Sequence, residues 1–314
     1  MVETENIIQI KGLRKSYKNV EVLRGIDLEV KKGSIFALLG SNGAGKTTTI
    51  KILSTLIKPD GGWAKLAGYD VVREPKHVRQ NISLTGQYAA IDEMLTGREN
   101  LKMIGKLRHI KKGKSEIEQL LDRFNLTESA DRRVSTYSGG MKRKVDIAMS
   151  LLGDPNILFL DEPTTGLDPQ SRKAMWEIIK GLSQSGVTIF LTTQYLNEAE
   201  ELADRISILN RGRIIAEGTN EELREIVSGN IVELYLKSGE SVEKAMRELK
   251  AYNPGLSDEK QMVRLETSGN VGEMKDIFDR LGQAGIEISN FEKRKASLED
   301  VFLKIISDDE EARK

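Results

Sequence analysis

The sequence predicts an α/β protein with a mainly parallel sheet, followed by a smaller α+β domain, and three observations support this. A glycine-rich loop at 40–45 connects an apolar strand to a helix. Two short and mainly apolar runs, at 157–160 and 187–191, flank a helical stretch, which is typical of parallel strands that helices bury on both faces. From residue 230 onwards, strand-like and helical stretches alternate in a more acidic segment.

The elements of the first domain follow in order along the chain. Strands are expected where β-branched and aromatic residues are bounded by polar turns, at 6–15, 22–30 and 34–39. A helix over 46–57 is stopped by a turn at 59–62 that contains Pro and two Gly residues. Residues 97–151 carry apolar side chains at helical spacing and form most of a helical subdomain at about 88–150. A further helix, over roughly 170–184, separates the two apolar runs.

We place a domain boundary near residue 229, which gives one domain over 1–229 and a second over 230–314. The second has 14 Lys and Arg against 18 Asp and Glu, a net charge of −4, so the preceding part carries +4. Its expected strands are 231–237, 262–267 and 286–292, and its expected helices are 241–251, 271–283 and 298–306.

Composition excludes several classes of protein and site. The chain has 314 residues, and 48 Lys and Arg are balanced by 48 Asp and Glu, which argues against a main role in binding nucleic-acid phosphates. It has no cysteine, which excludes disulfides, thiolate metal sites and cysteine nucleophiles. Its two histidines, His77 and His109, are too few for a histidine-rich metal site. No apolar run approaches the roughly 20 residues that span a bilayer, and the N-terminus lacks the form of a signal peptide, so we expect a cytosolic chain.

A phosphate-binding loop is predicted at 40–47, where the sequence matches G-x-x-x-x-G-K-[ST] between an apolar strand and a helix. Glycines allow backbone N–H groups to turn inward around phosphate oxygens, and the helix N-terminus favours an anion. In this pattern Lys46 bridges the β- and γ-phosphates of a nucleotide, and Thr47 offers its hydroxyl to Mg²⁺. The alternative, a chance glycine-rich turn, is disfavoured because strand and helix are both in place. The nucleotide-binding residues expected here are Gly40, Ser41, Asn42, Gly43, Ala44, Gly45, Lys46, Thr47 and Thr48.

Two carboxylates follow the apolar run at 157–160. A strand buried along its length delivers Asp161 to the edge of the sheet, where it can hold the ligand shell of Mg²⁺. Glu162, one residue further, is placed to orient an attacking water or to accept its proton. The alternative is a buried strand that ends in solvated acids, and the phosphate loop makes it the weaker interpretation.

A second anion site is predicted where Ser138, Gly139 and Gly140 open a helix that runs to about residue 151. Ser138 is an N-cap residue type, and the glycines expose backbone N–H groups at the start of the helix. Taken alone, this segment would suit an ordinary capped helix.

The order of these motifs resembles the ATP-binding subunit of an ABC transporter. The resemblance covers roughly residues 5–228 and rests on GSNGAGKTT, a lone Gln87, YSGGM, ILFLDE and the segment GLD at 166–168. It implies a P-loop NTPase of ABC type, with antiparallel N-terminal strands beside the main sheet and a helical signature subdomain.

The resemblance also implies roles for individual residues. Tyr17 would stack on adenine, and Gln87 would link Mg²⁺ and the attacking water to the surface near 87–100 where a membrane partner docks. Ser138 and Gly140 would reach the γ-phosphate bound to a second subunit, with Asp168 at the subunit boundary. This arrangement implies two nucleotides in a head-to-tail homodimer. The alternatives are a surface aromatic at Tyr17, a solvated amide at Gln87 and a helix cap at Asp168.

The sequence departs from the family in the switch loop after the strand near 188–192. Most members have His there, whereas this chain has Gln194. Glutamine can donate a hydrogen bond to a γ-phosphate oxygen, but it cannot become a cation or pass on a proton. We therefore expect hydrolysis, with Glu162 as the base, to survive but to be slow. Tyr137 and Met141 also replace the usual Leu and Gln, and neither change removes an anion-binding donor.

Gln194 and the ending ASLEDVFL at 296–303 are similar to one branch of the family. That branch contains the ATP-binding subunits of drug-resistance exporters of the daunorubicin type, which work with a separate permease. The ending carries an apolar stripe at helical spacing, which either packs the core of the C-terminal domain or docks onto a partner or the nucleotide domain, and both can hold. The stripe consists of Leu298, Val301, Phe302, Ile305 and Ile306.

The resemblance implies an ATPase subunit that powers export through an integral membrane permease. It would use ATP and Mg²⁺, act as a homodimer on the inner face of the cell membrane, and bind no nucleic acid. The expected catalytic residues are Lys46, Gln87, Glu162 and Gln194, and the expected metal ligands are Thr47, Gln87 and Asp161.

Two alternatives stay open at this point. One is a soluble ABC-type ATPase that acts on nucleic acid or the ribosome. Only 92 residues separate Lys46 from Ser138, too few for the coiled coil of the chromosome class, and a single phosphate loop disfavours the tandem ribosome class. The other is a nucleotide-gated binding module without activity, against which Lys46, Asp161 and Glu162 argue.

Overall fold

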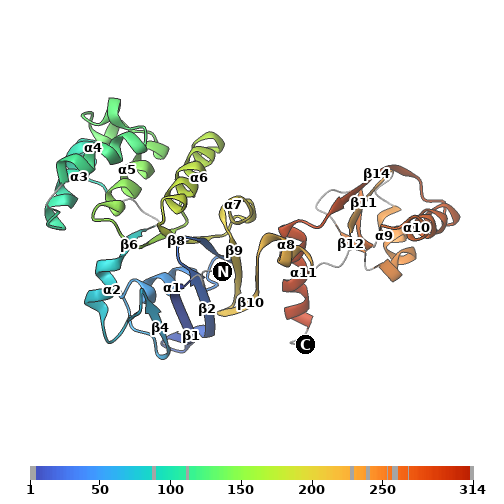
Figure 1. The fold of residues 1–314 in the computed structure, drawn as a ribbon. Helices are drawn as coiled ribbons and strands as arrows, with labels where there is room; N and C mark the ends of the chain where they lie inside the picture. Colours follow the sequence, from blue (N-terminus) through green and yellow to red (C-terminus); the bar gives the residue numbers. More distant parts are fainter. Residues whose placement is uncertain are drawn as a thin grey trace. The chain divides into compact units, whose positions relative to one another are not determined.

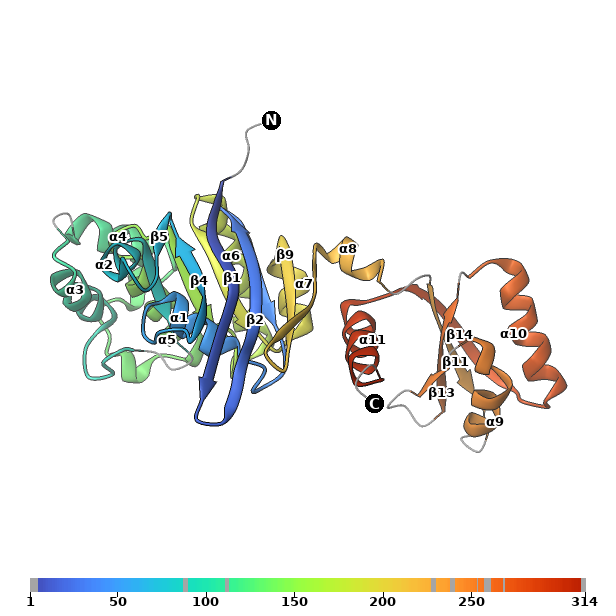
Figure 2. The same ribbon diagram turned by 90° about the horizontal axis from the view of Figure 1, so that it is seen from below.

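The structure of the chain is a computed structural model that describes residues 5–86, 90–110, 113–226, 230–237, 241–252, 254–256, 261–267 and 269–311. Figures 1 and 2 show its helices and strands from two sides. The chain divides into two compact units, Met1–Thr219 and Asn220–Lys314. The division lies before the boundary near 229 that the sequence predicts, because α8 (Asn220–Arg224) packs against α11 (Leu298–Glu311).

The first unit is built on a six-stranded sheet. In spatial order its strands are β10 (Arg213–Gly218), β9 (Arg205–Asn210), β3 (Ile35–Leu39), β8 (Thr188–Thr193), β7 (Ile157–Asp161) and β6 (Ile82–Thr85). All neighbours are parallel except β10, which is antiparallel to β9. Every residue of β3, β7 and β8 is buried, as their apolar sequences predict. Because these strands are parallel, the loops that follow them emerge at one edge of the sheet.

A second, antiparallel sheet belongs to the same unit. Its order is β2 (Val20–Lys31), β1 (Asn6–Tyr17), β4 (Gly61–Leu66) and β5 (Tyr69–Asp70). The two sheets share one hydrophobic core with α1 (Lys46–Leu53). Ile8 and Leu28 reach this core from the antiparallel sheet, Phe36 and Phe159 from the main sheet, and Ile50 from α1.

The predicted end of the first helix is wrong. The sequence places it at residue 57, whereas α1 ends at Leu53. Thr55 has a positive φ of 64°, and the N–H groups of Leu56 and Ile57 both donate to the carbonyl of Lys51. The chain therefore turns out of the helix four residues early.

Helices cover the rest of the first unit. They are α2 (Pro75–Asn81), α3 (Gly97–Leu107), α4 (Gly113–Arg123), α5 (Gly139–Leu151), α6 (Pro169–Gln184) and α7 (Leu196–Leu202). In Figure 1, α3, α4 and α5 lie together at one end of the unit, where α3 packs on both α4 and α5. Two 3₁₀ helices, Thr127–Ser129 and Val134–Thr136, interrupt the helical stretch expected at 97–151. Within the described ranges, no helix has both the length and the apolar character needed to cross a membrane.

The second unit contains a four-stranded antiparallel sheet. Its order is β12 (Gly255–Leu256), β13 (Met262–Thr267), β11 (Asn230–Leu236) and β14 (Ile288–Lys295). α9 (Ser241–Glu248) and α10 (Val271–Gln283) supply the core on one face, where Ala245 and Ile277 pack with Val232 and Leu234. A short 3₁₀ helix, Lys250–Tyr252, follows α9. In α11, Leu298 and Val301 of the predicted stripe are fully buried, whereas the neighbouring Leu303 is 53% exposed.

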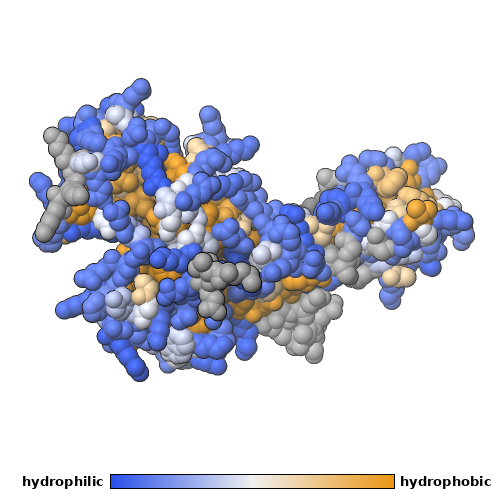
Figure 3. All heavy atoms as spheres, in the orientation of Figure 1, coloured by the Kyte–Doolittle hydropathy of each residue, from blue (hydrophilic) through white to orange (hydrophobic). Residues whose placement is uncertain are grey.

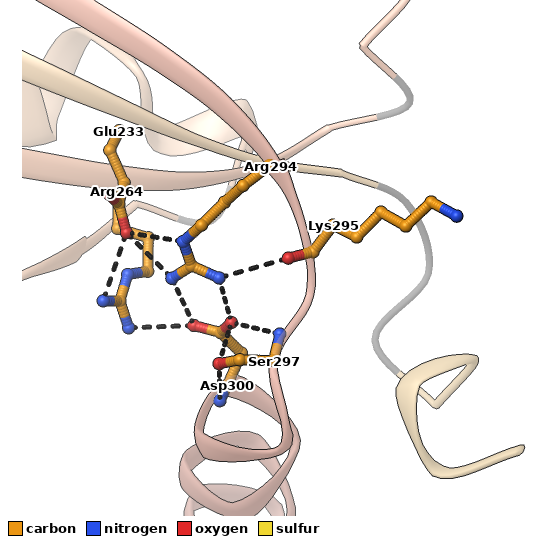
Figure 4. A network of polar contacts seen from close by, with 6 residues as sticks. All are labelled: Glu233, Arg264, Arg294, Lys295, Ser297 and Asp300. Carbon is orange, nitrogen blue, oxygen red and sulfur yellow. Dashed lines mark hydrogen bonds and ion pairs between the residues drawn. The ribbon is translucent and has the colours of Figure 1, made fainter. Parts of the chain in front are cut away.

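A partly buried ionic network joins the other face of this sheet to the start of α11 (Figure 4). Asp300 of α11 accepts from Arg294 Nη1 at 2.5 Å and lies 2.9 Å from Arg264 Nη1. Both arginines also contact Glu233 Oε1, at 2.8 Å and 3.3 Å. Asp300 N donates to Ser297 Oγ at 3.3 Å, which caps the helix, and Ser297 N donates to Asp300 Oδ2 at 2.7 Å. The network thus fixes α11 to β11, β13 and β14 through polar contacts.

Replacement of Asp300 tests how much this network stabilises the second unit. Burial raises the pKa of Asp300, but hydrogen bonds from Arg294 and Ser297 outweigh this effect and lower the pKa to about 2. A carboxylate with a depressed native pKa stabilises the fold above its unfolded pKa and loses this effect as the pH falls through the native pKa. We expect Asp300→Asn to lower the free energy of unfolding by about 2–3 kcal/mol near neutral pH. This loss of stability should become progressively smaller as the pH falls from about 4 to about 2.

Denaturant unfolding followed by circular dichroism measures this effect. Tryptophan fluorescence separates the two units, because Trp63 and Trp176, the chain's two tryptophans, both lie in the first. Glu287→Gln is the matched control, since Glu287 pairs with Lys237 on the exposed surface of the second unit and such pairs contribute little. Equal effects of the two substitutions near neutral pH would contradict a stabilising role for the network.

Candidate nucleotide-binding and catalytic site

The loop between β3 and α1 can be built only with glycine at two of its positions. Gly45 has a φ of 117°, which residues with a side chain rarely adopt. A β-carbon on Gly40 would lie 2.4 Å from the carbonyl oxygen of Leu209 in β9. Gly40 N donates to the carbonyl of Thr193 at 3.2 Å, which holds the loop to the end of β8. The backbone of the loop therefore runs directly against the edge of the sheet.

Lys46 is buried beneath this loop. Its Nζ donates to the carbonyl oxygens of Gly40 at 2.7 Å and Ser41 at 3.1 Å, and lies 3.5 Å from Glu162 Oε1. Burial lowers the pKa of Lys46, and the negative charges of Glu162 and Asp161 oppose that shift. The structure thus brings together the predicted lysine of the phosphate loop and the predicted base.

Asp161 ends β7 and is almost fully buried. Its Oδ1 accepts from Thr192 Oγ1 at 2.6 Å and from Thr47 Oγ1 at 3.4 Å. A hydroxyl and a carboxylate oxygen side by side are the hard donors that Mg²⁺ prefers, and this ion commonly keeps several waters. The described residues contain no cluster of three His, Cys, Asp or Glu side chains, but a Mg²⁺ site with one carboxylate does not need one. Thr47 and Asp161 therefore fit the expected metal site.

Glu162 follows β7 in a strained conformation. Its φ is 49°, in the left-handed region, which costs a non-glycine residue about 1–3 kcal/mol. Its N–H donates to the carbonyl of Thr192 at 3.1 Å, and Thr165 Oγ1 donates to its carboxylate at 3.2 Å. The turn directs the Glu162 carboxylate towards Lys46.

Gln194 lies directly after β8, at the same edge of the sheet, and is half-buried. The helix that follows it, α7, is anchored by the buried carboxyl of Glu198. This group accepts from Thr164 Oγ1 at 2.7 Å and from Trp176 Nε1 at 3.4 Å. Burial raises the pKa of Glu198, against the effect of hydrogen bonds from threonine hydroxyls and Trp176. Glu198 therefore ties the helix after Gln194 to the turn after Glu162.

The SGG segment and Asp168 form a second group. Ser138 caps α5 by accepting from Met141 N at 3.2 Å, and Asp168 caps α6 by accepting from Ser171 N at 2.9 Å. A β-carbon on Gly140 would lie 2.8 Å from Ser171 Oγ, so the two helix starts touch. The hydroxyl and N–H of Ser171 lower the pKa of Asp168. Capping by Asp168, one of the alternatives from the sequence, is therefore present.

Tyr17 and Gln87 are the other two predicted site residues. Tyr17 ends β1 with its side chain 45% exposed, and Lys15 Nζ lies 5.7 Å from the centre of its ring. Gln87 lies outside the described residues.

Sequence reasoning missed Thr192 and Glu198. A signal for Thr192 was available, because two threonines end the apolar run of β8 and side chains there lie at the edge that carries the loops. Glu198 gives no local signal, since its helix is rich in acidic residues and only the tertiary fold distinguishes the buried one.

Comparisons with known proteins identify the family of the chain. Residues 23–165 match the ABC transporter family, and residues 218–306 match the family of the C-terminal domain of ATP-binding proteins like DrrA1-3. The daunorubicin resistance ATP-binding protein DrrA3 of Streptomyces coeruleorubidus is 40% identical, with 97% of each chain covered. The Nod factor export ATP-binding protein I of Burkholderia lata is 36% identical, over 95% of this chain and 96% of that protein.

Solved structures show the same fold. The ATP-binding subunit of an ABC transporter superposes with a TM-score of 0.62 at 32% identity, over 70% of this chain and 92% of that chain. The ADP conformation of an ATP-binding cassette gives a TM-score of 0.63 at 25% identity, over 70% and 93%. The predicted α/β fold and the resemblance drawn from the motifs are thereby confirmed. The chain belongs to the ATP-binding subunits of ABC transporters, in the group of the daunorubicin-resistance ATP-binding proteins.

Proposed function

We propose that this chain is the ATP-hydrolysing subunit of an exporter and drives transport through a separate membrane permease. The observation that carries the proposal is the meeting of Lys46 and Glu162, 3.5 Å apart, at a phosphate loop with Asp161 beside it. The similar proteins reported above are named for drug resistance and for Nod factor export. The alternative of a soluble ATPase on nucleic acid or the ribosome finds no support among them.

Hydrolysis follows from the roles that the site residues can take. Backbone N–H groups of the phosphate loop and the Lys46 ammonium bind the β- and γ-phosphates of ATP, where Lys46 is already held beneath the loop. Glu162 orients the attacking water and accepts its proton. Gln194 donates to a γ-phosphate oxygen from the end of β8. Thr47 and Asp161 would hold Mg²⁺, which when bound neutralises charge that develops on the phosphates.

The site is completed by a second copy of the chain. Ser138 and Gly139 are exposed at the start of α5, where free N–H groups and the helix dipole favour an anion. In our proposal they bind the γ-phosphate held by the partner, with Asp168 beside them at the subunit boundary. Tyr17 stacks on adenine from the end of β1.

The permease docks on the helical subdomain near 87–100. Met94 in this segment and Leu107 at the end of α3 are each 69% exposed and offer apolar surface to a partner. On the face seen in Figure 3, apolar residues gather over the helices at the upper left. Gln87 lies in the same segment and links the docking surface to the site. Through the permease the chain is held at the inner face of the membrane.

Glu162→Gln tests the role of the base. Glutamine keeps the size of the side chain but cannot accept a proton, so we expect turnover to fall by about 10²-fold or more while ATP still binds. With ATP and Mg²⁺ the variant should accumulate as a dimer, which gel filtration with light scattering detects. Glu177→Gln, at an exposed position of α6, is the control and should behave as wild type. Turnover of Glu162→Gln at the wild-type rate would contradict the assignment.

Gln194→His tests the departure from the family. An imidazole adds a group that can carry charge and a proton, so we expect a higher kcat and a new inflection in the pH–rate profile near pH 6.5. Gln194→Ala should lower kcat by about tenfold, because a γ-phosphate contact is lost. If Gln194→Ala hydrolyses ATP as fast as the wild type, Gln194 does not contact the γ-phosphate.

A further inference from the structure

Arg143, on the second turn of α5, reaches three backbone carbonyls that belong to two other segments. Its Nε donates to the carbonyl of Pro163 at 3.0 Å, and its Nη2 donates to that of Asp161 at 3.2 Å. Its Nη1 donates to the carbonyl of Gly86 at 2.6 Å, at the end of β6. The side chain is only 7% exposed. The guanidinium of Arg143 therefore joins α5 to the turns after β6 and β7.

Asp146, one helical turn later, completes the junction. Its Oδ2 lies 3.2 Å from Arg143 Nη1, and its Oδ1 accepts from the N–H of Ala90 at 3.1 Å. Gly86 and Ala90 are the described residues on either side of Gln87. The pair thus holds both flanks of the segment that carries this glutamine.

Stability alone does not account for such a pair. Burial lowers the pKa of Arg143 and raises that of Asp146, and the attraction between the two opposes both shifts. Replacement of a buried ion pair by apolar residues of similar volume is often neutral or stabilising. What an apolar pair cannot supply is a rigid, planar set of donors aimed at three carbonyls.

Two of the three carbonyls that Arg143 holds lie immediately before and after Glu162. Glu162 has the left-handed φ of 49°, and strain of this kind persists only where the surroundings fix the backbone on both sides. Asp161 and Pro163 are these two sides, and Arg143 binds both. Removal of the guanidinium would let the turn relax and would move the carboxylate.

We propose that Arg143 is a positioning residue for ATP hydrolysis, which holds the turn of Glu162 and joins it to the flanks of Gln87 with Asp146. This inference rests on the proposed function. Arg143 connects Gly86 to the turn of Glu162 through a single side chain, so the junction also offers a direct mechanical path between the start of the permease-facing segment and the base.

Arg143→Lys and the double variant Arg143→Met, Asp146→Leu test the proposal in the full-length chain. Lysine keeps the charge but not the fork, and the apolar pair removes the donors without leaving a buried charge alone. We expect kcat to fall about tenfold to 10²-fold in both, since small displacements of a catalytic group have effects of this size. The Kd of a fluorescent ATP analogue should change by less than about twofold, because Arg143 contacts the base's turn and not the phosphate loop.

Lys180→Met is the matched control, because it removes a cation of α6 that pairs with Glu201 away from the site. A kcat for the Arg143 variants equal to that of the control would overturn the proposal. The proposal would also fail if the double variant combined a lower kcat with weaker ATP binding and a lower Tm, because the role of the pair would then be structural. If the wild-type chain binds ATP without hydrolysing it, the proposed function itself fails, and the inference falls with it.

Discussion

The parallel pairing of β3 and β7 on either side of β8 is the constraint on which the site depends. β8 ends in two threonines, and the carbonyl of each accepts a hydrogen bond from a different loop. Thr193 accepts from Gly40 N at 3.2 Å, and Thr192 accepts from Glu162 N at 3.1 Å. Because one strand sets the position of both loops, Lys46 and Glu162 meet although they are far apart in the sequence. Glu198 connects α7 and α6 to this edge of the sheet, because it lies in α7 and accepts hydrogen bonds from Thr164, in the turn after Glu162, and from Trp176 of α6.

The charges of the site explain why Lys46 can be buried. Two carbonyls and two carboxylates surround its ammonium, so the lost hydration is replaced by fixed acceptors. Phosphate oxygens carry more charge than carbonyl oxygens, and charge-assisted hydrogen bonds are the stronger ones. A phosphate of a bound nucleotide would therefore offer Lys46 stronger acceptors than the two carbonyls.

The chemistry of the site could be predicted from the sequence because its motifs are local. The phosphate loop, Asp161 and Glu162 each follow an apolar strand, and each strand is buried as its residues indicate. The strands β4, β5, β6, β9, β10 and β12 were not predicted. Of these, β4, β6 and β9 pair with strands that are distant in the chain, and β5, β10 and β12 each lie at the end of a sheet. The end of α1 depended on a left-handed Thr55, which its residue type does not favour. The division between the units depended on α8 packing on α11, a contact that only the fold creates.

The positions of Tyr137 and Gln194 in the structure indicate which departure from the family affects function. Tyr137 is buried, and its hydroxyl donates to the carbonyl of Ser129 at 2.5 Å. A β-carbon on Gly97 would lie 2.7 Å from that hydroxyl, so the start of α3 can approach only because residue 97 is glycine. Tyr137 therefore fastens the turn before Ser138 to the helical subdomain and leaves Ser138 exposed. Tyr137 therefore changes how the turn before α5 is anchored, but it removes none of the hydrogen-bond donors that this turn exposes. Gln194 instead changes the chemical group offered at the edge of the sheet, so the functional consequence of the departures is expected there.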